Sequence, residues 1–176
     1  MKTALNNYCF LFLTLSFFSL NSCGYNYSGK EAPRAEKGVL DLSSWDFIQD
    51  GPVQLKGEWN FWWQEFVDPQ VLSTQGLPAG SALFNVPGMW NNFEGFGPDK
   101  EVPSVSGFGS FVLRIKLPTD AETAIYLDRA ATAYSLVQKD LESGLVTRVI
   151  SNGSVGTSAD SSIPEYLHQT GRIRNG

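Results

Sequence analysis

The sequence has few of the residues that build metal, disulfide and nucleophilic sites. Among its 176 residues are two cysteines and one histidine. Cys9 lies in a segment expected to leave with an export signal, so Cys23 has no cysteine partner in the mature chain. The lone His168 provides neither a zinc site of several histidines nor a Ser–His couple, and it is expected at the surface. We therefore predict no metal ion and no cofactor.

Sequence signatures of catalysis are also missing. The chain has neither the glycine-flanked serine of a nucleophile elbow nor a glycine-rich phosphate-binding motif. Acidic pairs such as Asp140 and Glu142 occur, but two carboxylates in a turn are usually just solvated. We expect the chain not to be an enzyme.

Clusters of basic residues are absent as well. The sequence has 13 Lys and Arg against 18 Asp and Glu, a formal net charge of −5. A nucleic-acid-binding protein normally presents a concentrated basic face, whereas the basic residues here are scattered singly. Nucleic acid is not expected as a partner.

One long uncharged run lies near the amino terminus. Residues 8–20, YCFLFLTLSFFSL, follow Lys2. They are too few to cross a hydrocarbon core as a helix, which takes roughly 20 residues, and they are typical of an export signal. We predict a signal peptide over residues 1–22 and no transmembrane helix in the mature chain.

The end of this run, LNSC, resembles the bacterial lipobox. Leu20 lies three positions before Cys23 and the small Ser22 directly before it, although Asn21 is not the usual small residue. The resemblance implies lipidation of Cys23 and attachment to a membrane of a bacterial cell envelope, because acyl chains contribute roughly 0.8 kcal/mol per buried methylene. Gly24 favours the outer membrane. The alternative is an ordinary signal peptide cut near Ser22.

The segment after the cysteine shows no strand or helix period. Residues 24–38 are polar and rich in glycine and charge. Such a composition is typical of a flexible linker. We predict a lipidated tether over residues 23–38, with the fold beginning near Val39.

The rest of the sequence, residues 39–176, reads as short strands separated by glycine and proline. Apolar and polar residues alternate along most of these runs, and only residues 63–72 have room for a helical turn. This pattern predicts an all-β sandwich or jelly roll. The expected strands are 51–63, 81–87, 110–118, 123–130, 133–140 and 144–151.

Aromatic residues are the strongest signal in the chain, with five Trp and twelve Phe. Alternation along residues 57–63 puts Trp59, Phe61 and Trp63 on one face and Trp62 among polar residues on the other. We expect residues 64–72 to fold back over Trp62. The alternative is that Trp62 contacts a ligand.

A second candidate site lies in NVPGMWNNFEG, where Trp90 is followed by Asn91 and Asn92. Sugar sites combine a flat apolar surface for the C–H face of a pyranose with amides or carboxylates for its hydroxyls. Trp90, Asn91 and Asn92 are therefore candidate residues for binding a carbohydrate or related small molecule. The alternative is that Trp90 plugs one end of the sandwich and the asparagines form a turn.

Four motifs in order resemble the extracellular sensor domain of bacterial seven-transmembrane receptors with diverse intracellular signalling modules. They are L-x-G-E-W-x-F, V-P-x-x-W, G-x-G-x-F-x-L and a V-G-T-S turn followed by proline, and they span about residues 39–168. The matching residues are Leu55, Gly57, Glu58, Trp59, Phe61, Val86, Pro87, Trp90, Gly107, Gly109, Phe111, Leu113, Val155, Gly156, Thr157, Ser158 and Pro164.

This resemblance implies a jelly roll like the galactose-binding-type domains of glycoside hydrolases, and a carbohydrate or similar ligand outside the cell. The sequence departs from the family at residues 138–144, QKDLESG, where a tight Asn-Gly turn is usual and a looser loop is expected. It also ends at Gly176, where relatives have closing strands. We expect an incomplete sandwich with an open sheet edge, to which a protein partner could add.

Two functions follow from these observations. The first is a non-catalytic sensory module that binds a ligand outside the cytoplasm, as part of a membrane signalling receptor. The alternative is an envelope lipoprotein that serves as a structural or protein–protein interaction module.

Overall fold

The structure is a computed structural model that describes residues 27–93, 106–119, 121–128 and 130–173. Strands make up 39% of it and helices 6%, so the prediction of an all-β fold is confirmed. Three short 3-10 turns interrupt the strands: η1 (Pro69–Val71), η2 (Trp90–Asn92) and η3 (Ala159–Ser161). The strands are β1 (Val39–Asp41), β2 (Gly57–Trp63), β3 (Ala82–Val86), β4 (Gly109–Val112), β5 (Arg114–Lys116), β6 (Thr123–Leu127), β7 (Tyr134–Lys139), β8 (Val146–Asn152) and β9 (Gln169–Ile173).

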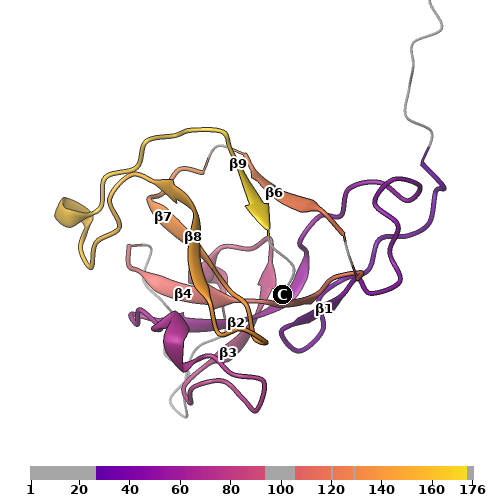
Figure 1. Ribbon diagram of the computed structural model, residues 1–176. Helices are drawn as coiled ribbons and strands as arrows, with labels where there is room; N and C mark the ends of the chain where they lie inside the picture. Colours follow the sequence, from indigo (N-terminus) through magenta and orange to yellow (C-terminus); the bar gives the residue numbers. More distant parts are fainter. Residues whose placement is uncertain (1–26, 94–105, 120, 129, 174–176) are drawn as a thin grey trace, which may run out of the picture.

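The described strands pair in four small sheets. An antiparallel sheet has the order β3-β2-β4, with β3 at one edge, and the other three sheets are the pairs β1-β5, β6-β9 and β7-β8. Only β1 and β5 run parallel. In Figure 1, β8 passes beside β9, which it contacts. These pairings establish a β-rich fold, and the jelly roll stays a prediction.

All six predicted strands occur, most of them shorter than predicted, although β4 begins one residue early at Gly109 and β8 ends one residue late at Asn152. The expected strand 110–118 is divided between β4, which pairs with β2, and β5, which pairs with β1. Alternation holds in β3, where Phe84 is buried and its neighbours Leu83 and Asn85 are exposed. Neither β1 nor β9 was predicted. β9 lies in the last stretch of the described chain and pairs with β6 along its whole length.

The loop between β7 and β8 is longer than a two-residue turn, as expected, but hydrogen bonds hold it. The Asp140 carboxylate accepts the backbone N–H groups of Glu142 at 2.7 Å and Ser143 at 2.9 Å. These bonds favour the charged carboxylate and lower the pKa of Asp140. The pair Asp140 and Glu142 therefore shapes a turn.

The tether was predicted over residues 23–38, of which residues 23–26 lie outside the described part of the chain. For residues 27–38 the prediction is wrong, because they pair with the fold. The Ala35 N–H donates to the Lys56 carbonyl at 2.7 Å, and the Glu58 N–H donates to the Ala35 carbonyl at 2.9 Å. Ala35 is buried with Leu40, Leu42 and Trp45, and these four residues form the centre of a hydrophobic cluster. Backbone pairing does not depend on side-chain period, so the sequence pattern gave no sign of it. We call residues 27–56 the N-terminal lobe.

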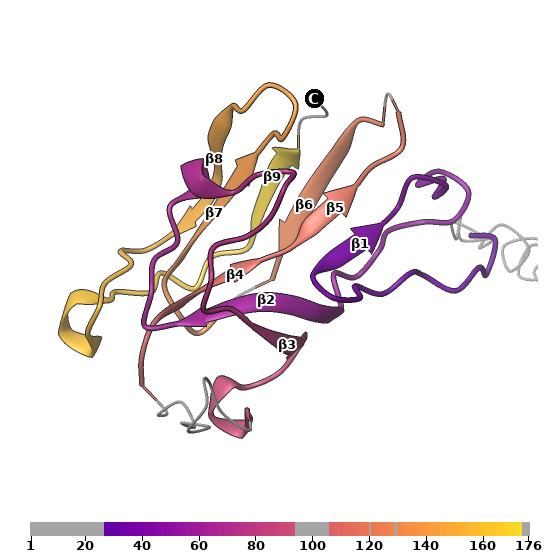
Figure 2. The ribbon, with the colours of Figure 1, turned by 90° about the horizontal axis from the view of Figure 1, so that it is seen from below.

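A second irregular segment connects β8 to β9 and includes η3. We call residues 153–168 the distal loop. Figures 1 and 2 show the N-terminal lobe and the distal loop at opposite ends of the described chain. The sheet β3-β2-β4, which carries Trp59, Trp62 and Trp63 on β2, lies between these two ends.

Candidate functional site

The sheet β3-β2-β4 carries a layer of aromatic rings on one side. Phe61 of β2 is buried at its centre, and the Phe111 ring of β4 stacks on it with 4.2 Å between ring centroids. The Phe84 ring of β3 packs edge-on against Phe61 at 5.5 Å. Trp59 and Trp63 lie on the same side of β2, as the alternation predicted. We call this side, with Trp59, Phe61, Trp63, Phe84 and Phe111, the aromatic face.

Trp90 lies against the aromatic face. Its ring is parallel to that of Phe61 at 6.4 Å and edge-on to that of Trp63 at 5.4 Å. The turn η2 positions it, closed by a hydrogen bond from the Asn92 N–H to the Met89 carbonyl at 3.0 Å. Trp90 is partly exposed and Met89 is exposed. The indole therefore packs on one side and reaches solvent on another.

The two asparagines follow Trp90 in the same turn. Asn92 is exposed, and its backbone is fixed by the bond to Met89. The side chain of Asn91 lies outside what the structure describes. Of the predicted site residues, the structure thus places Trp90 at the edge of the aromatic face and Asn92 in the same turn, exposed to solvent.

Glycines let the backbone approach these rings closely. A β-carbon at Gly109 would lie 2.6 Å from a Phe61 ring carbon, and one at Gly88 would lie 3.1 Å from the Phe84 ring. Both distances are shorter than ordinary carbon contacts. Gly88 and Gly109 therefore let the strand and loop close over the buried rings, which fixes the base on which Trp90 rests.

Trp62 points to the opposite side of β2 and has no exposed surface. Its indole N–H donates to the Ala79 carbonyl at 3.1 Å. The Ser110 hydroxyl, across the strand pair on the same side, accepts the Val67 N–H at 2.9 Å and donates to the Glu65 carbonyl at 2.8 Å. We call residues 64–81 the covering loop.

The covering loop explains why Trp62 is buried. The expected part of the chain does fold back over this side of the sheet, through its bonds to Ser110. The residue that binds the indole, Ala79, comes from beyond the expected segment. A side chain with no exposed surface cannot contact a ligand unless its cover moves, so the alternative of Trp62 as a ligand platform is wrong for this structure.

The covering loop also borders a shallow hollow of about 660 Å³. Its lining mixes apolar side chains such as Val71 and Leu77 with the carboxylates of Glu65 and Asp68. The hollow is formed by residues other than Trp90 and the aromatic face. In this hollow a small molecule could contact both apolar and polar groups.

Sequence reasoning did not assign Phe111 to the candidate site. Phe111 is 38% exposed, and it joins the partly exposed rings of Trp63 and Trp90 around the buried Phe61. The alternation in residues 110–118 predicted on which side of its strand Phe111 lies, but it did not predict which strand pairs with that segment. Pairing of β4 with β2, residues far apart in the sequence, is what places Phe111 opposite Phe61.

His168 lies at the surface in a small polar group. Its Nδ1 is 2.8 Å from a carboxylate oxygen of Asp128 and 3.0 Å from the Tyr126 hydroxyl. All three side chains are exposed. The described residues contain no group of three or more His, Cys, Asp or Glu side chains that could hold a metal ion.

Chemically, the edge of the aromatic face can stack and form hydrogen bonds. Exposed ring surface gives van der Waals and C–H contacts to a flat ligand, and the Asn92 amide has both a donor and an acceptor.

No helix in the described part of the chain is long and apolar enough to cross a membrane.

Comparisons with known proteins give no relative. No family model, no curated protein and no solved structure matches this chain. The resemblance to receptor sensor domains, carried by the motifs on β2, β4 and the distal loop and by the one from the end of β3 to η2, therefore stays a prediction.

Proposed function

We propose that this chain is a lipid-anchored module that binds a carbohydrate or related small ligand outside the cytoplasm of a bacterium, without catalysing a reaction. The observation that carries the proposal is the partly exposed indole of Trp90 resting on a packed layer of aromatic rings. The jelly-roll fold and the sensory role belong to the same proposal, and both rest on the resemblance of the sequence motifs.

A fixed indole suits sugar recognition for a physical reason. A ligand that stacks on Trp90 loses little further side-chain entropy from the protein, because Phe61 and Trp63 already restrict the ring. Asn92 is exposed in the same turn, and its amide can pair with a ligand hydroxyl, which would give orientation as well as contact area. Phe111 extends the apolar surface on the β4 side.

The anchor rests on the sequence. An uncharged run of 13 residues followed by LNSC supports export and acylation at Cys23. Two or more acyl chains hold a protein on a bilayer stably, whereas a single chain binds only marginally. The domain would then meet ligands in the envelope, with the outer membrane as the proposed site of attachment.

A thermal-shift screen of the full chain against a glycan panel tests the binding. A glycan that raises the melting temperature of the parent should raise that of Trp90→Ala much less, and Asn92→Ala should fall between them. Val71→Ser is the matched control, because Val71 is an exposed apolar residue of the hollow on the covering loop.

Two results would contradict this assignment. If no sugar shifts the parent, the carbohydrate proposal fails. If a shift survives Trp90→Ala but is lost in Val71→Ser, the ligand binds in the hollow and the site proposed here is wrong.

The distal loop favours a second candidate function, an envelope interaction module. Four apolar side chains of this loop are exposed, more than a solvated connection needs. A photo-cross-linking residue at position 163 in intact cells should then give one discrete protein adduct that is missing at the exposed control position 143. The four residues are Val155, Ile163, Tyr166 and Leu167.

A further inference from the structure

We propose that the N-terminal lobe lies directly on the lipid bilayer beside the acylated cysteine, with Ile48 and Tyr27 entering the headgroup region. This inference rests on the lipid anchor of the proposed function. It adds an orientation: the lobe faces the membrane, while the distal loop at the opposite end faces away from it (Figures 1 and 2).

The length of chain between the lipid and the fold is short. Only Gly24, Tyr25 and Asn26 separate Cys23 from Tyr27. Four steps of at most about 3.6 Å each place Tyr27 no further than about 14 Å from the cysteine. The polar layer on each side of a bilayer is roughly 5–7 Å thick, so a chain this short holds Tyr27 near that layer and lets it enter.

Hydrogen bonds dock the start of the lobe next to the loop that carries Ile48. The Ser28 N–H donates to the Gln49 carbonyl at 2.8 Å. Tyr27 precedes Ser28 and Ile48 precedes Gln49, so this hydrogen bond brings the backbone at Tyr27 close to the backbone at Ile48. The Tyr27 ring also lies close against Gly51, where a β-carbon would come within 2.7 Å of it.

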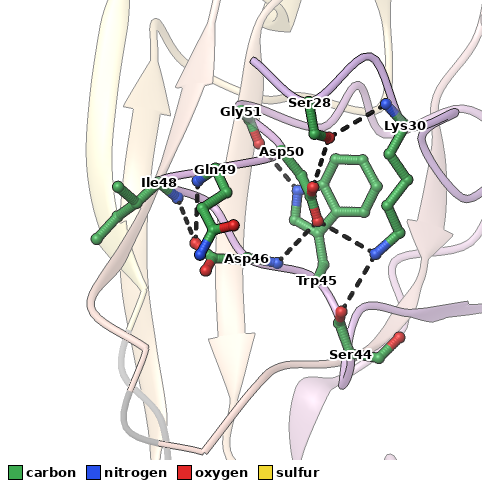
Figure 3. Close-up of polar contacts among 9 residues, drawn as sticks. All are labelled: Ser28, Lys30, Ser44, Trp45, Asp46, Ile48, Gln49, Asp50 and Gly51. Atoms are coloured by element: carbon green, nitrogen blue, oxygen red, sulfur yellow. Dashed lines mark hydrogen bonds and ion pairs between the residues drawn. The ribbon is translucent and has the colours of Figure 1, made fainter. Parts of the chain in front are cut away.

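A rigid turn presents Ile48. The Asp46 carboxylate accepts the Ile48 N–H at 2.9 Å and the Gln49 N–H at 3.0 Å, and the Asp50 N–H donates to the Asp46 carbonyl at 2.7 Å. Figure 3 shows the Ile48 side chain pointing away from this polar group. Ile48 is 90% exposed and Tyr27 is 46% exposed. Apolar side chains and tyrosines are favoured at a membrane–water interface.

The carboxylates near Ile48 already have partners within the lobe. Asp50 accepts the Ser28 hydroxyl at 2.6 Å and the Lys30 ammonium at 3.1 Å. The same ammonium lies 4.8 Å from the centroid of the Trp45 ring (Figure 3). Neutralised charge and satisfied donors lessen the desolvation penalty when this surface approaches lipid.

The test places a fluorescent label at position 48 of the full-length lipoprotein in vesicles of phosphatidylethanolamine and phosphatidylglycerol. Acylation occupies the sulfur of Cys23, so in Ile48→Cys the new thiol is the one available to an environment-sensitive dye. Ile163→Cys is the matched control, because Ile163 is also an exposed isoleucine and lies in the distal loop. Lipids carrying a quencher at the headgroup should quench the dye at 48 severalfold more strongly than the dye at 163, with a blue shift at 48 alone.

Each other result overturns the inference in a recognisable way. Equal quenching at both positions means that the lobe has no preferred contact with lipid. A blue shift at 48 without lipid quenching means that a protein covers it. Mass spectrometry of the amino terminus separates the two proposals. If Cys23 is acylated and one of these two results is found, only the contact of the lobe with the bilayer is disproved. If Cys23 is unmodified, both the lipid anchor and that contact are disproved.

Discussion

Residues 27–38 and the distal loop, residues 153–168, share one property in the sequence: both are polar, rich in small residues and without a strand period. In the structure they differ. Residues 27–38 pair with the chain just before and within β2 through the backbone of Ala35, which is buried. The distal loop is closed by paired bonds between Ser154 and Ile163, both at 2.9 Å, and exposes its apolar side chains.

The difference shows what makes an irregular segment part of a core. An irregular segment becomes fixed when its N–H and C=O groups find partners on a strand edge and one small side chain fits beneath it. Gly57 makes this possible for residues 27–38, because the Ala35 backbone occupies the space of its missing side chain. The distal loop instead forms its bonds mainly within itself, so its apolar residues remain available to solvent or to a partner.

The largest expected effect comes from Gly57→Ala. Gly57 has φ of +116°, which a residue with a β-carbon rarely adopts, and the added carbon would collide with the Ala35 carbonyl oxygen. The free energy of unfolding should fall by about 2–4 kcal/mol, as measured by urea denaturation.

Gly144→Ala is the matched control. Gly144 also has a positive φ, of +73°, but a β-carbon there meets nothing within 4 Å. Its loss should be about 1 kcal/mol, the cost of backbone strain alone. Equal losses in the two variants would mean that residues 27–38 are not docked at Gly57.

Asn152→Ala should weaken the base of the distal loop. Asn152 is fully buried, its Nδ2 donates to the Thr132 carbonyl at 3.0 Å, and its Oδ1 accepts the Leu167 N–H at 3.3 Å. Removing the amide breaks both bonds and leaves a cavity in place of a fully buried side chain, which together cost about 1–3 kcal/mol in unfolding free energy. Ser151→Ala, at an exposed neighbour, should change the melting temperature little, and a similar loss there would argue against the buried bonds.

Asp50→Asn should loosen the lobe in a pH-dependent way. The hydrogen bond from the Ser28 hydroxyl, with a smaller contribution from Lys30, holds the pKa of Asp50 below its ordinary value, although desolvation acts in the opposite direction. Because this pKa is lowered in the folded state, the stabilisation is present above the ordinary pKa and disappears as the pH falls from about 4 through the folded pKa.

The measurement is limited proteolysis of the lobe against pH. Asp50→Asn should be cleaved faster than the parent at neutral pH, and its loss of stability should be smaller than that of Asn152→Ala. In acid the cleavage rates of Asp50→Asn and the parent should converge. Asp160→Asn, in the exposed turn η3, is the control and should behave as the parent does. A constant difference across the pH range would show that the Asp50 charge is not what holds the segment.

Ile163→Ser should have the smallest effect on stability. Ile163 is exposed, and its backbone rather than its side chain makes the bonds that close the distal loop. The unfolding free energy should change by no more than about 0.5 kcal/mol. A larger loss would mean that the side chain packs in the fold, and the contrast between the two regions would disappear.

The sequence predicted the parts of this fold that side-chain alternation reports. β2, β3, β6 and β7 lie within their predicted segments, β8 runs one residue past its predicted end, and Trp62 is covered, as expected. Alternation carries no information about which strands pair, so the division of 110–118 between two sheets, the parallel pair β1-β5 and the position of Phe111 were not predictable from it.

The candidate site was predictable to a similar extent. A tryptophan after a strand end, followed by two asparagines, predicted an indole in a loop, and the turn formed by Trp90, Asn91 and Asn92 agrees with the alternative interpretation of the asparagines. The rings beneath it come from β2, β3 and β4, and their stacking depends on pairing between distant residues. The tether was predicted wrongly because its order comes from backbone bonds, which polar composition does not exclude.

The most direct test of this account is amide hydrogen exchange of the full chain, read residue by residue. The Ala35 and Ser28 amides donate to the Lys56 and Gln49 carbonyls, so they should be protected to nearly the same degree as the amides of β2. Amides at exposed positions of η3 should exchange much faster. Exchange of Ala35 and Ser28 at the rate of an unstructured peptide would contradict the docked lobe and, with it, the orientation on the membrane.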